Sequence, residues 1–326
     1  MTVDVAFITG ANSGLGFGHA ARCLHLASIV RASGLSCGMY GNFSPEASAR
    51  IKAFAPDVFV GSDTGMGLPR IAVVDRLSDS DDAESADIAA IETCRSKGVR
   101  VICIVSGITL PKLPADVKIV GYQPSSIESA GNVNWGLDYA PVPPQAIDLR
   151  GQTRDRSRAL IALGGHSDLA PLSVICRALA TIRDISTIDI LMSPVAADKT
   201  PADLKLGAHQ TVTIRSAVPD ILPLLAEAGL VIASLGNLVY EALALGAPVC
   251  VVGQKSFQVS LAERLSALDI CVSAGAAIPE REAEIQKAIQ RTVTRSADLS
   301  ARALAAIDGR GFERIAGMIV ETARHG

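Results

Sequence analysis

The chain has 326 residues, of which 49% are apolar and 19% are charged, and its formal net charge at pH 7 is -3. A chain of this length and apolar content can bury two sheet-containing cores. The small negative charge gives no electrostatic basis for binding nucleic acid, and no apolar run approaches the roughly 18 residues that a membrane-spanning helix needs.

In the first half of the chain, short apolar runs alternate with amphipathic stretches, which is typical of a parallel β-sheet covered by helices. The apolar runs are rich in Val and Ile, which indicates strands that are buried on both faces. We predict strands at residues 3–9, 37–40, 58–61, 71–74 and 99–105. We predict helices at residues 18–33, 45–54 and 83–96.

A proline-rich and then charged segment interrupts this pattern. Pro141, Pro143 and Pro144 cannot continue a ladder of strand hydrogen bonds, and the charged run after them has no apolar periodicity. We therefore predict a first domain over residues 1–145, a linker over 146–157, a second domain over 158–310 and a final amphipathic helix over 311–326.

After the predicted linker the alternation restarts, which suggests a second domain of the same kind. Strands are expected at residues 158–163, 188–192, 212–214, 230–233 and 249–252. Helices are expected at residues 171–182, 221–228, 238–245 and 259–267. The economical architecture is an α/β protein with two Rossmann-like domains that face each other across a cleft.

The 7 cysteines are scattered and form no Cys-x-x-Cys pair, so zinc and redox motifs are absent. We expect reduced core thiols in a cytoplasmic protein that uses no metal and no cofactor.

The loop sequence TGANSGLGFGHAAR at residues 9–22 admits two interpretations. Its first half is similar to the nucleotide loop of short-chain dehydrogenases. Those enzymes need a Tyr followed four positions later by Lys, because the cation helps to deprotonate the phenol. The residues four positions after the tyrosines of this chain are Ser44, Ser126, Pro143 and Ala244. A dehydrogenase is therefore disfavoured.

The second half of the loop, GFGHAAR, resembles the first loop of the UDP-sugar hydrolase of pseudaminic acid synthesis. It is also similar to spore-coat polysaccharide proteins and, more distantly, to the peptidoglycan N-acetylglucosaminyl transferase. Further segments match in the same order, namely the strand that ends at Asp75, residues 136–142, the Gly-Gly loop at 164–168 and the unit 230–248 with Gln258. This resemblance covers most of the chain and implies the two-domain glycosyltransferase-B (GT-B) fold.

The resemblance also implies roles for particular residues. His19 matches the base that activates water, and a neutral imidazole is suited to remove a proton near pH 7. The loops at Gly164 and Ser234 would receive a diphosphate on backbone N–H groups at helix N-termini. Glu241 would bind ribose hydroxyls and Gln258 would lie near the donor sugar. The full candidate set is Gly16, Gly18, His19, Arg22, Asp75, Gly164, Gly165, His166, Ser234, Gly236, Asn237, Glu241 and Gln258.

The donor loop departs from the family pattern. The family's Ser and Thr before the aromatic-Glu pair are absent from residues 236–241, where only Asn237 offers a partial substitute, and Phe257 replaces the Asn before Gln258. Three hypotheses therefore stay open. The principal one is a hydrolase that cleaves the anomeric C–O bond of a UDP-linked amino sugar with water and inversion, in the synthesis of a bacterial surface or flagellar glycan. The alternative is an inverting glycosyltransferase with a glycan, lipid or protein acceptor. The third is a non-catalytic module that binds nucleotide sugars.

Overall fold

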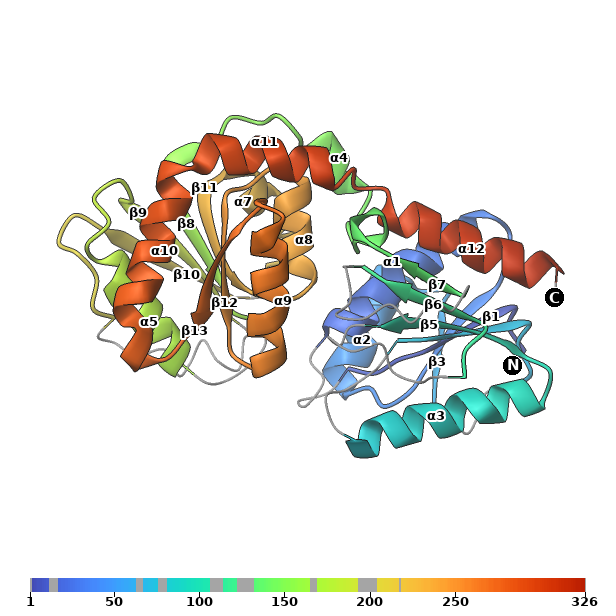
Figure 1. Cartoon of the computed structure of the whole chain (residues 1–326). Helices are drawn as coiled ribbons and strands as arrows, with labels where there is room; N and C mark the ends of the chain where they lie inside the picture. Colours follow the sequence, from blue (N-terminus) through green and yellow to red (C-terminus); the bar gives the residue numbers. More distant parts are fainter. Residues whose placement is uncertain are drawn as a thin grey trace. The chain divides into compact units, whose positions relative to one another are not determined.

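The computed structural model describes residues 2–11, 17–62, 67–75, 81–105, 114–121, 132–164, 169–192, 204–216 and 218–325, with the side chains of 81–87 left out. The chain forms two compact units (Figure 1). The first unit comprises Met1–Pro143 with Arg310–Gly326, and the second comprises Pro144–Gly309. None of the helices in the described ranges is both long and apolar enough to cross a membrane.

The first unit is built on a 7-stranded parallel sheet in the order β3-β2-β1-β4-β5-β6-β7. The strands are β1 (Val5–Ile8), β2 (Cys37–Tyr40), β3 (Phe59–Gly61), β4 (Ile71–Val74), β5 (Arg100–Val105), β6 (Val117–Val120) and β7 (Val133–Trp135). The direction of strand addition reverses between β1 and β4, which pair in register along their whole length. In open α/β sheets, ligands bind beyond the carboxyl ends of the strands at this kind of switch point.

Helices from both ends of the chain cover one face of this sheet. They are α1 (Gly18–Ala32), α2 (Pro45–Phe54) and α12 (Gly311–His325), and they share one buried apolar cluster with β1 and β2. Ser44 caps α2, because its side chain accepts a hydrogen bond from the backbone of Ala47 at 3.2 Å. On the opposite face lies α3 (Asp81–Ser96), as Figure 1 shows. A short 3-10 helix, η2 (Leu137–Tyr139), follows β7.

The final helix belongs to the first unit, although it follows the second unit in the sequence. The ring of Phe312 stacks on that of His25 at a centroid distance of 5.5 Å, and the ring of Phe54 meets His25 edge-on at 5.4 Å. Gly311 lies so close to the backbone of Ala140 that a Cβ there would come within 2.0 Å of the carbonyl oxygen. Only glycine allows this approach, and it docks the start of α12.

The second unit is built on a 6-stranded parallel sheet in the order β10-β9-β8-β11-β12-β13. The strands are β8 (Asp155–Ala162), β9 (Thr187–Met192), β10 (Thr211–Ser216), β11 (Ala228–Ser234), β12 (Val249–Gly253) and β13 (Val272–Ala276). The strand order reverses between β8 and β11 here, so this unit has a switch point of its own.

Helices cover both faces of the second sheet (Figure 1). On one face α5 (Ala170–Leu179) and α10 (Glu282–Thr294) enclose a large apolar cluster with β8, β9 and β11. On the other face lie α8 (Asn237–Ala244) and α9 (Ser256–Ala267). The remaining helices are α4 (Gln145–Asp148), α7 (Leu222–Glu227), η3 (Pro279–Arg281) and α11 (Ser296–Ala306).

The segment that we expected to be a linker is folded into the second unit. Its residues form α4 and the start of β8, which begins at Asp155. Arg150 donates hydrogen bonds to the carbonyls of Ala244 at 2.8 Å and Ile307 at 2.5 Å. Arg154 donates to the carbonyl of Leu225 at 2.8 Å and to neighbouring carbonyls. The charged side chains therefore serve as anchors, because an arginine can satisfy several backbone carbonyls at once.

The strands β6, β7 and β13 and the helices α4, α10 and α11 were not predicted from the sequence. The strands β6, β7 and β13 include Lys118, Asn134 and Gly275, which weaken the apolar signal of a buried strand. The strands and helices that were predicted agree with the structure to within a few residues wherever the structure describes them.

Candidate functional site

The first group of candidate residues lies at the switch point of the first unit. His19 and Arg22 are three positions apart on α1, so their side chains leave the same face of that helix. Asp75 follows β4 directly, and its backbone N–H donates to the carbonyl of Ile8 at 2.9 Å. This bond ties the end of β4 to the end of β1, so the carboxylate is held beside the first turn of α1.

The side chains of this group converge on the Asp75 carboxylate. His19 Nδ1 lies 2.8 Å from Asp75 Oδ1. Arg22 donates from Nε to Oδ2 at 2.6 Å and from Nη2 to Oδ1 at 2.5 Å, which makes a two-pronged ion pair. The thiol of Cys23 donates to Oδ2 at 3.6 Å. The Asp75 side chain is fully buried, whereas 20% of the His19 side chain is exposed.

Two opposing effects set the charge of Asp75. Burial raises the pKa of this carboxyl, but the charge and hydrogen bonds of Arg22, helped by His19, outweigh it and hold the pKa well below its usual range. Asp75 is therefore an ionised carboxylate. For Cys23, burial and the charge of Asp75 raise the pKa of the thiol, so this side chain stays protonated and can donate.

The negative charge of Asp75 determines which ring nitrogen of His19 carries a proton. A carboxylate only accepts hydrogen bonds, so the contact at 2.8 Å requires a proton on His19 Nδ1. Arg22 Nη2 also lies 3.2 Å from Nδ1, but a protonated Nδ1 cannot accept from it. In the neutral ring the lone pair is then on Nε2, and none of the residues that the structure describes forms a hydrogen bond with that nitrogen. This is the arrangement that a general base needs.

A second group of candidate residues lies at the carboxyl ends of strands in the second unit. Gln254, which the sequence analysis did not single out, joins three of the loops. Its Nε2 donates to the carbonyl of Leu163, after β8, and to Oγ of Ser234, at the end of β11, both at 2.6 Å. Because Ser234 accepts from Gln254, its own hydroxyl hydrogen remains available for an anion.

Two glycines shape the backbone of these loops. Gly164 adopts φ +82°, a left-handed conformation that favours glycine. Apart from its chain neighbours, no atom of the described residues lies within 4 Å of the place where its Cβ would be. Gly236 is extended, with φ 179°, and its surroundings are equally open. It precedes Asn237, the first residue of α8, whose leading N–H groups are the donors that a helix N-terminus offers to a phosphate.

Gln258 is engaged within the protein. Its Oε1 accepts from the backbone N–H groups of Gln254 at 2.9 Å and Lys255 at 3.2 Å, and its Nε2 donates to the carbonyl of Leu235 at 3.0 Å. The side chain is buried and holds the start of α9 against the loop after β11. These contacts support the backbone of the two loops, and the position near the donor sugar that the resemblance implies stays a prediction.

Glu241 lies one turn inside α8 and is partly buried. Burial raises the pKa of its carboxyl, and the negative charge of Asp220 raises it further, to about 7. This carboxyl can therefore change its protonation state near neutral pH.

The structure thus brings the candidates together in two groups, one in each unit. The sequence did not indicate that Arg22 binds Asp75, and it placed Arg22 among the substrate-binding residues. One feature of the sequence could have identified Gln254 as a candidate, namely its position directly after the apolar strand β12. Gly16, Gly165 and His166 lie outside the described residues. Within the described ranges, no three His, Cys, Asp or Glu side chains are grouped to hold a metal ion.

The fold is similar to that of several solved proteins over nearly the whole length of both chains. One is CalG4, the calicheamicin glycosyltransferase, at 15% identity over 98% of both chains with a TM-score of 0.67. Another is the spinosyn rhamnosyltransferase SpnG complexed with thymidine diphosphate, at 14% identity over 95% of this chain and 99% of that one, with a TM-score of 0.63. A third is a putative UDP-N-acetylglucosamine 2-epimerase from Listeria monocytogenes, at 15% identity over 99% and 97% of the chains, with a TM-score of 0.59.

No protein-family model and no curated protein matches the chain. The structural similarity confirms the predicted α/β fold of GT-B type, with two parallel-sheet units. At these identities it establishes the fold alone, because proteins of one fold catalyse different reactions. Evidence for the function comes from the two groups of residues, one around Asp75 in the first unit and one around Gln254 in the second.

Proposed function

We propose that the chain is a glycosyltransferase that moves a sugar from a nucleoside diphosphate to a hydroxyl group, with His19 as the general base. The observation that carries this proposal is the contact between His19 Nδ1 and the buried, ionised Asp75, which leaves Nε2 as the proton acceptor. The fold shared with CalG4 and SpnG supports it.

In the proposed reaction, Nε2 of His19 removes the proton from the acceptor hydroxyl as its oxygen attacks the anomeric carbon. The bond from that carbon to the diphosphate oxygen breaks, and its electron pair leaves with the diphosphate. A single displacement of this kind inverts the anomeric configuration. The ring of His19 becomes positively charged, and the Asp75 carboxylate stabilises that charge without taking the proton.

The second unit would bind the donor. A diphosphate carries negative charge, which the first N–H groups of α8 and the hydroxyl of Ser234 can meet without a metal. Glu241 would accept hydrogen bonds from the nucleoside sugar, as the family resemblance implies. Thymidine diphosphate is bound in the SpnG structure, and this supports a nucleoside diphosphate as the ligand class.

Water would be the acceptor if the protein were the hydrolase that we first predicted from the sequence. The donor and the base would be the same in both reactions. Transfer is the better supported of the two, because CalG4 and SpnG are transferases. The UDP-linked amino sugar and its glycan pathway rest on the sequence resemblance.

The test is a release assay with UDP-, TDP- and GDP-sugars, performed with and without a panel of hydroxyl acceptors. We expect release of the nucleoside diphosphate to depend on an acceptor and to yield a glycosylated product. Rapid release without any acceptor would establish the hydrolase instead. Binding of nucleoside diphosphate without turnover under either condition would favour a binding module, and absence of binding would refute the proposal.

A further inference from the structure

We propose that Arg22 is a positioning residue for His19, which it controls through Asp75. By occupying both carboxylate oxygens, Arg22 holds Asp75 in the orientation that receives the proton of His19 Nδ1. Its positive charge also offsets part of the charge of Asp75, which would otherwise favour a second proton on the ring and occupy the Nε2 lone pair. This inference rests on the proposed function, in which His19 is the base.

The geometry of the Arg22 contact is specific to arginine. Its Nε and Nη2 meet the two oxygens of Asp75 at 2.6 and 2.5 Å, which matches the planar fork of a guanidinium to a carboxylate. The Arg22 side chain is 9% exposed and that of Asp75 is 0% exposed, so water screens this pair little. A lysine could supply the charge at this position but could not hold both oxygens.

The charged groups around His19 indicate how removal of Arg22 would change the protonation of the imidazole. Asp75 reaches the ring from the end of β4, and Arg22 and Cys23 reach the site from α1. On α2, the guanidinium of Arg50 lies 4.3 Å above the ring of Phe17, two residues before His19. Of these groups, only Asp75 and Arg22 touch the imidazole. Without Arg22, His19 would face an uncompensated buried carboxylate at 2.8 Å, which favours a second proton on the ring. A doubly protonated imidazole cannot act as a base.

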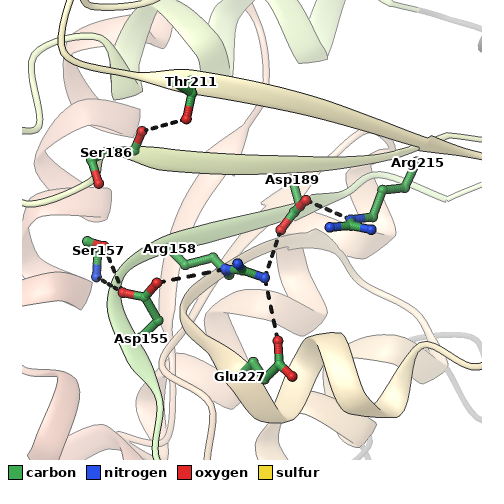
Figure 2. Close-up of polar contacts among 8 residues, drawn as sticks. All are labelled: Asp155, Ser157, Arg158, Ser186, Asp189, Thr211, Arg215 and Glu227. Carbon is green, nitrogen blue, oxygen red and sulfur yellow. Dashed lines mark hydrogen bonds and ion pairs between the residues drawn. The ribbon is translucent and has the colours of Figure 1, made fainter.

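The second unit contains a matched ion pair, and none of the histidines that the structure describes is in contact with it (Figure 2). Asp189, which is almost fully buried on β9, accepts from Arg215 Nε at 2.7 Å and lies 3.5 Å from Arg158 Nη1. Arg158 in turn approaches Glu227 at 3.5 Å. The variant Arg215→Gln therefore removes an arginine from a buried aspartate in the same protein without changing the surroundings of His19.

The experiment follows the imidazole of His19 by NMR in protein labelled with ¹⁵N-histidine. The chain has only 5 histidines, and the His19→Gln spectrum assigns the signal. We expect the titration midpoint of His19 to rise by about one pH unit or more in Arg22→Gln, the size of effect that a neighbouring charge exerts. Arg22→Lys should shift it less, and Arg215→Gln should leave it unchanged. If activity is found, the acid limb of its pH profile should move by the same amount.

An unchanged His19 midpoint in Arg22→Gln would overturn the inference, as would equal shifts in Arg22→Gln and Arg22→Lys. If Arg22→Gln does not fold, Arg22→Lys carries the test, because it keeps a positive charge beside Asp75 but cannot hold both carboxylate oxygens. Its His19 midpoint should then lie above that of the unsubstituted protein, and an unchanged midpoint would overturn the inference. The titration needs no donor or acceptor, so its result is distinct from a failure of the proposed transferase activity.

Discussion

His19 Nδ1 lies 2.8 Å from Asp75 Oδ1, although the two residues are 56 positions apart in the sequence. The direct pairing of β1 with β4 brings them together, because His19 lies in the first turn of α1, after the loop that follows β1, and Asp75 directly follows β4. The imidazole and the carboxylate that orients it therefore lie beyond the ends of two neighbouring strands, at the point where the sheet order reverses, which is where α/β proteins bind their ligands.

The variant His19→Gln should have a much lower kcat but should still bind the nucleotide donor. A general base contributes typically about 10² to 10⁴ in rate, so we expect kcat to fall by a factor in that range. Binding of a nucleoside diphosphate, measured by calorimetry, should stay within about twofold, because the proposed diphosphate site lies in the second unit. His325→Gln, at the exposed end of α12, is the control. Full activity in His19→Gln would exclude this residue as the base.

Removal of the Gln254 side chain should weaken nucleotide binding. The variant Gln254→Ala frees the carbonyl of Leu163 and the hydroxyl of Ser234, which lose hydrogen bonds worth about 1 kcal/mol each. We expect the Kd for UDP or TDP to rise about 5- to 30-fold in titration calorimetry. Gln286→Ala is the matched control, since Gln286 makes an exposed bond to Thr181 in the same unit. Equal affinities in the two variants would show that the loops after β8, β11 and β12 do not bind the diphosphate.

The two glycines of the proposed donor site should respond differently to alanine. Gly164 has φ +82°, so Gly164→Ala should lower the free energy of unfolding by about 1 to 2 kcal/mol. Gly236 is extended and has open surroundings, so Gly236→Ala should change stability by less than about 1 kcal/mol. Urea denaturation of both variants checks this contrast, and an equal loss of stability would contradict the left-handed backbone at Gly164.

The protonation of Glu241 should make stability depend on pH. Its pKa is raised from 4.5 to about 7 in the folded state, so the folded protein binds this proton more tightly than the unfolded chain. The ionisation of Glu241 therefore costs stability, and the cost grows as the pH rises from about 4.5 and is complete above about 7. We expect Glu241→Gln to raise the free energy of unfolding at pH 8 by about 1 to 3 kcal/mol, with no gain at pH 4.5.

Calorimetric melting of the Glu241→Gln variant and of the unsubstituted protein at the two pH values measures this effect. Glu263→Gln, on the exposed side of α9, controls for the loss of one negative charge. A stability gain of the same size at both pH values would rule out a titrating Glu241.

The apolar periodicity predicted the elements that matter most for the site. The strands β1, β4, β8, β11 and β12 are near-continuous apolar runs, and the glycines, His19, Asp75 and Ser234 lie at or just beyond their carboxyl ends. The position of these residues after buried strands followed from that pattern alone. Polar or glycine-containing strands such as β6 and β13 were missed, because their burial comes from neighbours that are distant in the sequence.

Local sequence by itself determined that the chain forms two α/β units and which residues stand at the ends of their central strands. Only the tertiary structure decided the partners of those residues. It paired Arg22 with Asp75, engaged Gln258 with backbone groups, introduced Gln254 as the link between three loops, and joined α12 to the first unit. Hydrophobic periodicity is a property of neighbouring residues and survives in a single segment, whereas a hydrogen bond or ion pair between distant positions exists only after strand pairing has brought both groups to one place.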